Sequence, residues 1–155
     1  MRTVADIMTR EVLTIRPEKS VRELASLLAH ARISGVPVVD ESGKLVGVVS
    51  QTDVAAYASH ALPTSRDPHG YYQGVWLGVP GELPAMGEAL VADIMAPYAY
   101  FAHEETSLLE LADLMLDRRI HRILVLRSSQ VVGIVSSLDL IRALRDQLVV
   151  SKNED

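Results

Sequence analysis

Two short motifs in the chain place a serine three residues before an aspartate. Ser50-Gln51-Thr52-Asp53 follows the apolar run 45–49, and Ser136-Ser137-Leu138-Asp139 follows the similar run 131–135. Both runs are short and rich in β-branched residues, so we expect buried strands that lead into helices. An aspartate in the first turn of such a helix can accept hydrogen bonds from both hydroxyls of a ribose. The spacing therefore predicts Asp53 and Asp139 as ribose ligands.

The residues around each aspartate add further donors. Ser50 and Ser136 supply a hydroxyl, and the backbone N–H groups at the start of each helix suit a phosphate or ribose oxygen. Thr52 could donate a further hydrogen bond at the first motif, whereas Leu138 at the matching position cannot. We therefore expect the two sites to be related but not identical.

The same motifs also have a purely structural interpretation. A serine followed three residues later by an acid at the head of a helix is a capping pattern, which contributes about 0.5–2 kcal/mol to stability and binds nothing. One side chain could serve both purposes. On the sequence alone the cap and the ligand site therefore both stay open.

The composition excludes several classes of partner and chemistry. The formal net charge of −5 argues against nucleic acid or an anionic membrane as the main partner. The chain has no cysteine, which excludes disulfides, thiol catalysis and cysteine-ligated metals, and its five histidines show no metal-ligand spacing. No Gly-rich phosphate loop or nucleophile elbow appears, so an enzyme is poorly supported. We expect a non-catalytic protein without a metal site or required cofactor.

The location of the protein can also be predicted from the sequence. No apolar run approaches the ~20 residues that span a bilayer, and the N-terminal residues lack the apolar stretch of a signal peptide. We therefore expect a soluble, cytoplasmic protein.

The chain contains an internal repeat. Val4-Ala5-Asp6-Ile7-Met8 recurs as Val91-Ala92-Asp93-Ile94-Met95, and residues 4–39 share 14 identities in 36 positions with residues 91–126. After one deletion, residues 45–54 share 5 identities in 10 with residues 131–140. This level of identity predicts a duplicated unit of roughly 55 residues.

Each repeat has the same predicted order of elements, β-α-β-β-α, after a short helical turn. Ser20 with Glu23, and Ser107 with Glu110, form capping boxes at the start of the first long helix. The closing helix of the second repeat is longer, from Ser137 to about Val149, and its apolar residues cover more than one side. We expect that helix to pack against another surface, plausibly a second subunit.

The repeats divide the chain into parts. We assign residues 1–59 to the first repeat, 60–90 to a Pro/Gly-rich insertion, 91–150 to the second repeat and 151–155 to a frayed tail. The insertion carries Tyr71, Tyr72 and Trp76, which we expect to cover a surface rather than to stack on a ligand.

These motifs together resemble a pair of CBS domains, also called a Bateman module. The chain has two Val-x-Asp-Ile-Met boxes and two closing motifs, Gly47–Asp53 and Gly133–Asp139, and Ile33–Val39 resembles the middle-strand signature of that family. The resemblance covers residues 3–59 and 91–149. It implies a mixed α/β (α+β) fold in which two β-α-β-β-α repeats pack with pseudo-two-fold symmetry and leave two clefts. It also implies a homodimer shaped as a four-repeat disc.

The resemblance further implies that adenine nucleotides such as AMP, ADP or ATP bind in these clefts and that the module signals to an effector protein on another chain. The adenine would lie against the middle strand, near Val36 and Pro37 or near Ile123, with Thr14 or Phe101 close by. Phosphates need cations, for which the candidates are Arg32, Arg119, His121 and Arg122. S-adenosylmethionine or a cyclic dinucleotide would also supply a ribose, and a ligand-free interaction scaffold is the alternative function.

Overall fold

The computed structural model describes residues 2–59, 89–97 and 99–152, which form two compact units. Unit 1 comprises Met1–Val12 and Tyr100–Asp155, and unit 2 comprises Leu13–Ala99. Most of the predicted insertion, including Tyr71, Tyr72 and Trp76, lies outside the described residues.

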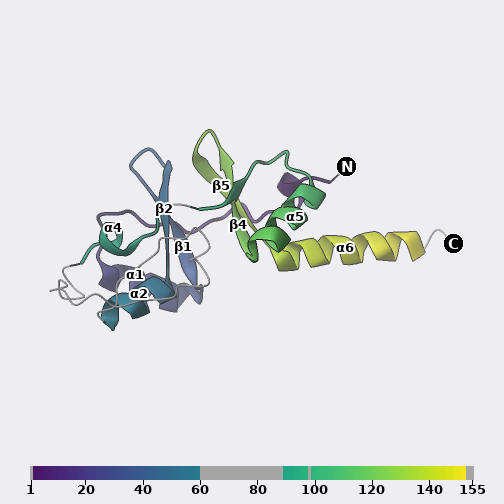
Figure 1. Ribbon diagram of the computed structural model, residues 1–155. Coiled ribbons are helices and arrows are strands. Elements are labelled where there is room, and N and C mark those ends of the chain that lie inside the picture. Colours follow the sequence, from purple (N-terminus) through teal and green to yellow (C-terminus); the bar gives the residue numbers. More distant parts are fainter. Residues whose placement is uncertain (1, 60–88, 98, 153–155) are drawn as a thin grey trace. The chain divides into compact units, whose positions relative to one another are not determined.

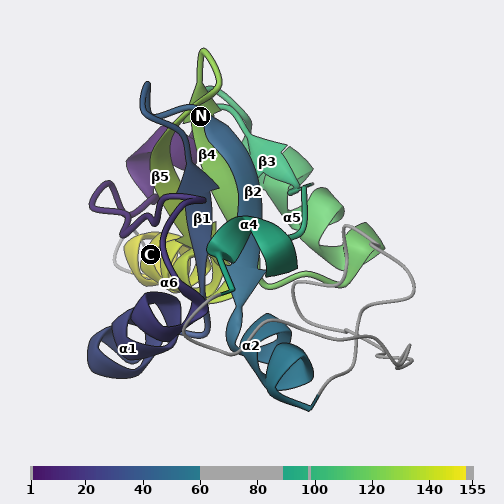
Figure 2. The same cartoon turned by 90° about the vertical axis from the view of Figure 1, so that its left-hand side faces the viewer.

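Unit 2 is built on an antiparallel pair of strands, β1 (Gly35–Val39) and β2 (Leu45–Ser50). Ile15 adds a parallel bridge beside Val38, where the sequence predicts an extended piece. The described residues of the unit also form three helices: α1 (Val21–Ala31), α2 (Gln51–Ala58) and α4 (Val91–Ile94). Figures 1 and 2 show α1 beside α2, and these two helices are in contact.

Unit 1 repeats this plan with a three-stranded sheet in the order β3-β4-β5. Its strands are β3 (Phe101–Ala102), β4 (Arg122–Arg127) and β5 (Gln130–Ser136), and its helices are η1 (Val4–Asp6), α5 (Leu108–Arg118) and α6 (Ser137–Lys152). β3 runs parallel to β4, and β5 runs antiparallel to β4. The predicted β-α-β-β-α order is therefore confirmed in the second repeat, whereas in the first repeat the opening strand is reduced to the single bridge at Ile15.

The first long helix of each repeat begins at the predicted capping box. The Glu23 N–H donates to Ser20 Oγ at 3.1 Å, and the Ser20 N–H donates back to the Glu23 carboxylate at 2.9 Å. The corresponding distances between Glu110 and Ser107 are 3.2 and 2.9 Å. The apolar faces behind these caps are buried, because the periodic leucines of α1 and α5 point into the two cores.

Each unit has its own hydrophobic core. In unit 2 the core joins the strands to the three helices through Ile15, Val21, Leu24, Leu28, Val36, Val38, Val49, Tyr57, Ala89, Val91 and Ile94. In unit 1 it consists of Val4, Met8, Ala102, Leu111, Met115, Ile120, Ile123, Val125 and Val135. Among the helices of the described ranges, none combines the length and apolar character that a membrane crossing requires.

The two repeats exchange their opening segments. Residues 2–12 of the first repeat belong to unit 1 with most of the second repeat, and the segment from Val91 of the second repeat belongs to unit 2 with most of the first. The Val4 N–H donates to Thr106 O at 2.9 Å in unit 1, and the Val91 N–H donates to Lys19 O at 2.8 Å in unit 2. The two segments occupy equivalent positions, because Val4 corresponds to Val91 and Thr106 to Lys19. The sequence repeats and the compact units therefore divide the chain differently.

A second set of backbone hydrogen bonds fixes these segments against the last strand of each unit. Thr9 exchanges N–H···O bonds of 2.8 and 2.9 Å with Ile134, and Ala96 exchanges bonds of 2.8 and 2.9 Å with Val48. Such a close approach needs a residue without a side chain next to it, and Gly133 and Gly47 occupy those places.

We predict that alanine is tolerated worse at Gly47 than at Gly133. A Cβ at Gly47 would lie 2.6 Å from Ala96 O, a backbone atom in a paired segment, whereas a Cβ at Gly133 would lie 2.5 Å from Met8 Sδ, the end of a flexible side chain. We expect a loss in the free energy of unfolding of about 3 kcal/mol for Gly47→Ala and about 1 kcal/mol for Gly133→Ala. Urea denaturation of both variants measures the difference, and equal losses would contradict the explanation.

Candidate functional site

The first Ser-x-x-Asp motif forms a helix cap at the end of β2. Ser50 is only 3% exposed, its N–H donates to Asp53 Oδ2 at 2.6 Å, and its hydroxyl donates to the same oxygen at 2.8 Å. The Asp53 N–H donates to Ser50 Oγ at 3.4 Å. Within the described part of the chain, Asp53 Oδ1 accepts no hydrogen bond. The cap predicted from the sequence is confirmed, and it uses one carboxylate oxygen and leaves the other open.

The second motif forms the same cap at the end of β5. The Ser136 N–H and hydroxyl donate to Asp139 Oδ2 at 2.8 and 2.6 Å, and the Asp139 N–H donates to Ser136 Oγ at 3.3 Å. Here the second oxygen, Oδ1, lies 3.4 Å from Arg142 Nη1. The residue at the matching position of α2 is Ala56. The two carboxylates therefore differ in the charge beside the open oxygen.

The environment of Asp53 also changes its acidity. Burial raises the pKa of the Asp53 carboxyl above its usual range, and the hydrogen bonds from the Ser50 side chain and backbone lower the pKa without cancelling that effect. A partly desolvated carboxylate gains more from a new hydrogen-bond donor than a hydrated one does. A ligand hydroxyl at Oδ1 would be such a donor.

The helix starts offer fewer free backbone donors than the sequence suggests. The Gln51 N–H donates to Ser34 O at 2.8 Å, and the Ser137 N–H donates to His121 O at 2.9 Å. The N–H groups of the two aspartates are also used, since they donate to the serines of the caps. Two of the first three N–H groups of each helix are therefore already bonded.

The structure brings the predicted adenine contacts to the same end of each sheet as the caps. In unit 2 the Ile15 N–H donates to Pro37 O at 3.1 Å, so Thr14 lies next to the start of β1, where Gly35 pairs with Ser50. Thr14 is exposed, whereas Val36 and Pro37 are buried. Because the side chains of Val36 and Pro37 are buried, a ligand here could contact the strand backbone and the Thr14 side chain.

Unit 1 has the same arrangement with different side chains. Phe101 pairs with Leu124, and Arg122 pairs with Ser136. Phe101 is 48% exposed and meets the His103 ring edge-to-face at 5.5 Å between centroids. Ile123 is buried, while His121 and Arg122 are exposed. An exposed aromatic ring at this end of the sheet offers a surface on which a base can stack.

Two of the predicted phosphate ligands have a backbone role that the sequence does not reveal. Arg32 and Arg119 both have φ of 53°, in the left-handed region, directly after α1 and α5. The residues after them, Ile33 and Ile120, donate backwards to Leu28 O at 3.1 Å and to Met115 O at 3.0 Å. This is the Schellman ending of a helix, a position where glycine is the usual residue. Both arginines are exposed, and their role as phosphate ligands stays a prediction.

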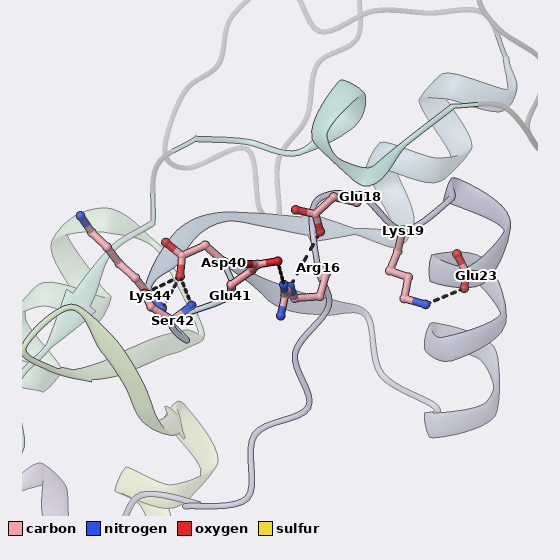
Figure 3. A network of polar contacts seen from close by, with 8 residues as sticks. All are labelled: Arg16, Glu18, Lys19, Glu23, Asp40, Glu41, Ser42 and Lys44. Atoms are coloured by element: carbon pink, nitrogen blue, oxygen red, sulfur yellow. Dashed lines mark hydrogen bonds and ion pairs between the residues drawn. The ribbon is translucent and has the colours of Figure 1, made fainter.

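Polar contacts support the segment that carries Thr14. Arg16 lies 3.8 Å from the Glu18 carboxylate and 3.4 Å from the Glu41 carboxylate, as Figure 3 shows. In the same view Asp40 Oδ1 accepts hydrogen bonds from the Ser42 N–H and hydroxyl and from the Lys44 N–H, which closes the turn between β1 and β2. The segment before α1 is therefore joined by an exposed ion pair to a turn that is itself closed by hydrogen bonds.

The corresponding segment of unit 1 is held by a stronger ion pair. Arg127 donates two hydrogen bonds to Glu104, at 2.6 and 2.8 Å, and Arg10 lies 3.6 Å from the same carboxylate. The bond from Arg127 lowers the pKa of Glu104. Because Glu104 is close to Phe101 in the chain, this ion pair helps to fix the position of the exposed ring.

Comparison with known proteins identifies the repeat. A family model described as the CBS domain matches residues 4–60 and 91–146. The CBS domain-containing protein CBSX1, chloroplastic, of Arabidopsis thaliana is 32% identical over 149 residues, which cover 91% of this chain. The chain spans 63% of the length of CBSX1, and 63% of that of CBSX2 from the same plant. Both matched ranges begin at a Val-Ala-Asp-Ile-Met box, so the predicted duplication is confirmed.

Two solved structures are similar over most of both chains. The crystal structure of CBSX2 in complex with AMP has a TM-score of 0.70 and 25% identity, and covers 94% of this chain and 98% of its own. The CBS domain pair of protein MJ0100 in complex with 5′-methylthioadenosine and S-adenosyl-L-methionine has a TM-score of 0.67 and 26% identity. It covers 95% of this chain and 98% of its own.

We predict that glycine stabilises the ends of α1 and α5. Arg32→Gly and Arg119→Gly remove the cost of a side chain in the left-handed region, so each variant should gain about 1 kcal/mol in the free energy of unfolding. Arg118→Gly is the control, because this neighbouring residue is helical and lies over the Tyr100 ring at 5.3 Å. It should lose about 1 kcal/mol or more. Urea denaturation measures both effects, and a loss at Arg32 or Arg119 would contradict the assignment.

We also predict that the stability contributed by Asp53 falls as pH rises. Its pKa is higher in the folded than in the unfolded state, so its contribution is fully present below the unfolded pKa and decreases as pH rises through the folded pKa. The free energy of unfolding of wild type relative to Asp53→Asn should therefore decrease between about pH 3 and pH 7.

Glu110 provides the opposite case for the same pH series. Hydrogen bonds from the Ser107 backbone and side chain lower its pKa, so wild type should gain stability relative to Glu110→Gln as pH rises. If the two differences changed in the same direction, the assigned environment of Asp53 would be wrong.

Proposed function

The chain belongs to the CBS domain family, and on this basis we propose that it is a non-catalytic regulatory module that binds an adenine nucleotide, AMP, ADP or ATP, at Asp53 and Asp139. The observation that carries the proposal is the geometry of the two caps. Each cap satisfies its serine and helix start with one carboxylate oxygen, Oδ2, and leaves Oδ1 outside the cap. The capping and the ligand-binding interpretations of the motif are thus compatible in one side chain.

In the proposed complex the ribose hydroxyls donate to Oδ1 of the aspartate. The adenine lies against the backbone at the start of the middle strand, near Val36 and Thr14 in unit 2 and near Ile123 and Phe101 in unit 1. Phe101 offers its exposed ring to the base, whereas Thr14 offers a hydroxyl, so the two sites should differ in affinity. The remaining candidates for contacts with the ligand are Pro37, Thr52, Arg122, His121, Arg32 and Arg119.

The solved complexes support an adenosyl ligand rather than one particular nucleotide. CBSX2 was crystallised with AMP, and the MJ0100 pair with 5′-methylthioadenosine and S-adenosyl-L-methionine. These compounds share adenosine and differ in what is attached at the 5′ position. S-adenosylmethionine is therefore the second candidate ligand.

We further propose that a second copy of the chain covers the outer face of α6. Figure 1 shows the C-terminal half of this helix extending away from the sheet of unit 1. Five large apolar side chains along it are more than half exposed: Leu138, Ile141, Leu144, Leu148 and Val149. Their spacing forms an apolar stripe of the kind that antiparallel or parallel helix pairs bury. The effector protein and a cytoplasmic location stay predictions from the sequence.

The proposed function is tested by direct binding. Isothermal titration of the nucleotide-free protein with AMP, ADP, ATP and S-adenosylmethionine should give saturable binding for at least one of them, and the bound ligand should raise the melting temperature. Asp53→Asn and Asp139→Asn should each remove or weaken one site. Asp113→Asn, an exposed position on α5, is the matched control and should leave binding unchanged.

The opposite result would favour the scaffold function. Wild-type protein that binds none of the four ligands, while Asp53→Asn and Asp139→Asn change only stability, would show that the motifs are caps and nothing more. Mass spectrometry of small molecules released from freshly purified protein checks that the sites were empty before titration.

A further inference from the structure

Unit 1 contains a cavity. Of the residues predicted to contact the ligand, only Asp139 lines it. Its volume is about 590 Å³, and it lies between the segment around η1 and the first half of α6. The residues that line it are Arg2, Asp6, Ile7, Thr9, Asp139, Arg142, Ala143 and Asp146. A cavity of this size is within the range of small-molecule sites.

Two arginines in the cavity have most of their donors unused. The Arg2 guanidinium makes a single contact of 3.5 Å, from Nη1 to Ala143 O, and Arg142 makes only the 3.4 Å contact with Asp139 within the described residues. Each guanidinium carries five N–H donors. The Arg142 side chain is 69% exposed, so its position is adjustable.

Each of the three acidic residues of the cavity has one carboxylate oxygen engaged within the described residues. Asp6 Oδ2 accepts the Thr3 N–H at 2.7 Å, and Asp146 Oδ1 accepts two hydrogen bonds from Arg145, at 2.7 and 3.0 Å. Asp139 Oδ2 belongs to the helix cap. The two arginines therefore have the largest unused bonding capacity, which suits an anion. Asp139 Oδ1, which accepts only the 3.4 Å contact from Arg142 within the described residues, can accept a further bond from a hydroxyl.

The matching positions of unit 2 lack this set of groups. Alanine replaces both arginines, since Ala89 corresponds to Arg2 and Ala56 to Arg142. Tyr57 takes the place of Ala143, and this tyrosine is 4% exposed and packs in the core of unit 2. None of these three residues carries a positive charge, so of the two units only unit 1 has the pair of guanidinium groups at these positions.

We propose that Arg2 and Arg142 bind the 5′-phosphate of the ligand whose ribose is held by Asp139. The proposal rests on the proposed function and adds the specificity of one site: the Asp139 site selects phosphorylated adenosine, whereas the matching positions around Asp53 carry no such selection. Guanidinium groups recognise phosphate oxygens through paired N–H donors, and a ribose phosphate presents hydroxyls and an anion within one small molecule. Arg119 does not line the cavity and is not needed for this role.

The test compares AMP with adenosine in the full-length chain. The Asp53→Asn background leaves Asp139 as the site under study, and isothermal titration gives the affinity for each ligand. Arg2→Ala combined with Arg142→Ala reproduces the residues of unit 2, and should weaken AMP about tenfold or more per arginine. Adenosine affinity should change much less, by no more than about twofold, since adenosine has no phosphate for the two guanidinium groups to bind.

A charge-matched control separates specific contact from general electrostatics. Arg22→Ala removes one exposed helical arginine in unit 2 and should leave AMP affinity unchanged. Arg142→Lys keeps the charge but loses the paired donors, and should give an intermediate AMP affinity. Thermal melting of the ligand-free variants checks that each is folded.

The outcomes distinguish the two proposals. Binding of none of AMP, ADP, ATP and S-adenosylmethionine by the wild type would overturn the proposed function. Binding of AMP that the double variant leaves unchanged, or an equal loss of AMP and adenosine, would overturn the phosphate assignment alone. A selective loss of AMP would support both.

Discussion

The backbone pairing of Thr9 with Ile134 and of Ala96 with Val48 is the constraint on which the two units depend. It holds the opening segment of each repeat against the last strand of the unit formed mainly by the other repeat. Val4 and Met8 then complete one core, and Val91 and Ile94 complete the other. Glycine is needed where these backbone segments approach closely, which explains why β2 carries Gly47 and β5 carries Gly133. Neither repeat would bury its apolar residues without a segment from its counterpart.

The two caps link stability to ligand binding. Asp53 and Asp139 each hold the start of a helix with one carboxylate oxygen, so under the proposed function a hydroxyl bound at the other oxygen would contact a residue that also fixes the helix. A shift of the aspartate on binding would move the start of α2 or α6 directly. The long exposed face of α6 makes this helix the more suitable of the two to pass a change on to another protein chain.

Much of the fold could be predicted from the sequence because the signals are local. The capping boxes at Ser20 and Ser107, the short β-branched strands and the helical spacing of leucines all depend on neighbours within a few residues. The exchange of opening segments could not be predicted in this way, since Val4 and Val91 are identical and fit either core. The left-handed conformation of Arg32 and Arg119 was also missed, because arginine is not a typical residue at that position.

The discontinuity of unit 1 has a consequence for biosynthesis. The chain leaves the ribosome from its N-terminal side, so unit 2, which is continuous from Leu13 to Ala99, can close before β3 to α6 have been made. Residues 2–12 emerge before unit 2 but complete their contacts only after β5 has been translated, since Thr9 pairs with Ile134. The segment that carries Val4 and Met8 is therefore synthesised before unit 2 but buried after it. The apolar box that it shares with Val91 gives it a competing place in unit 2 until the second copy arrives.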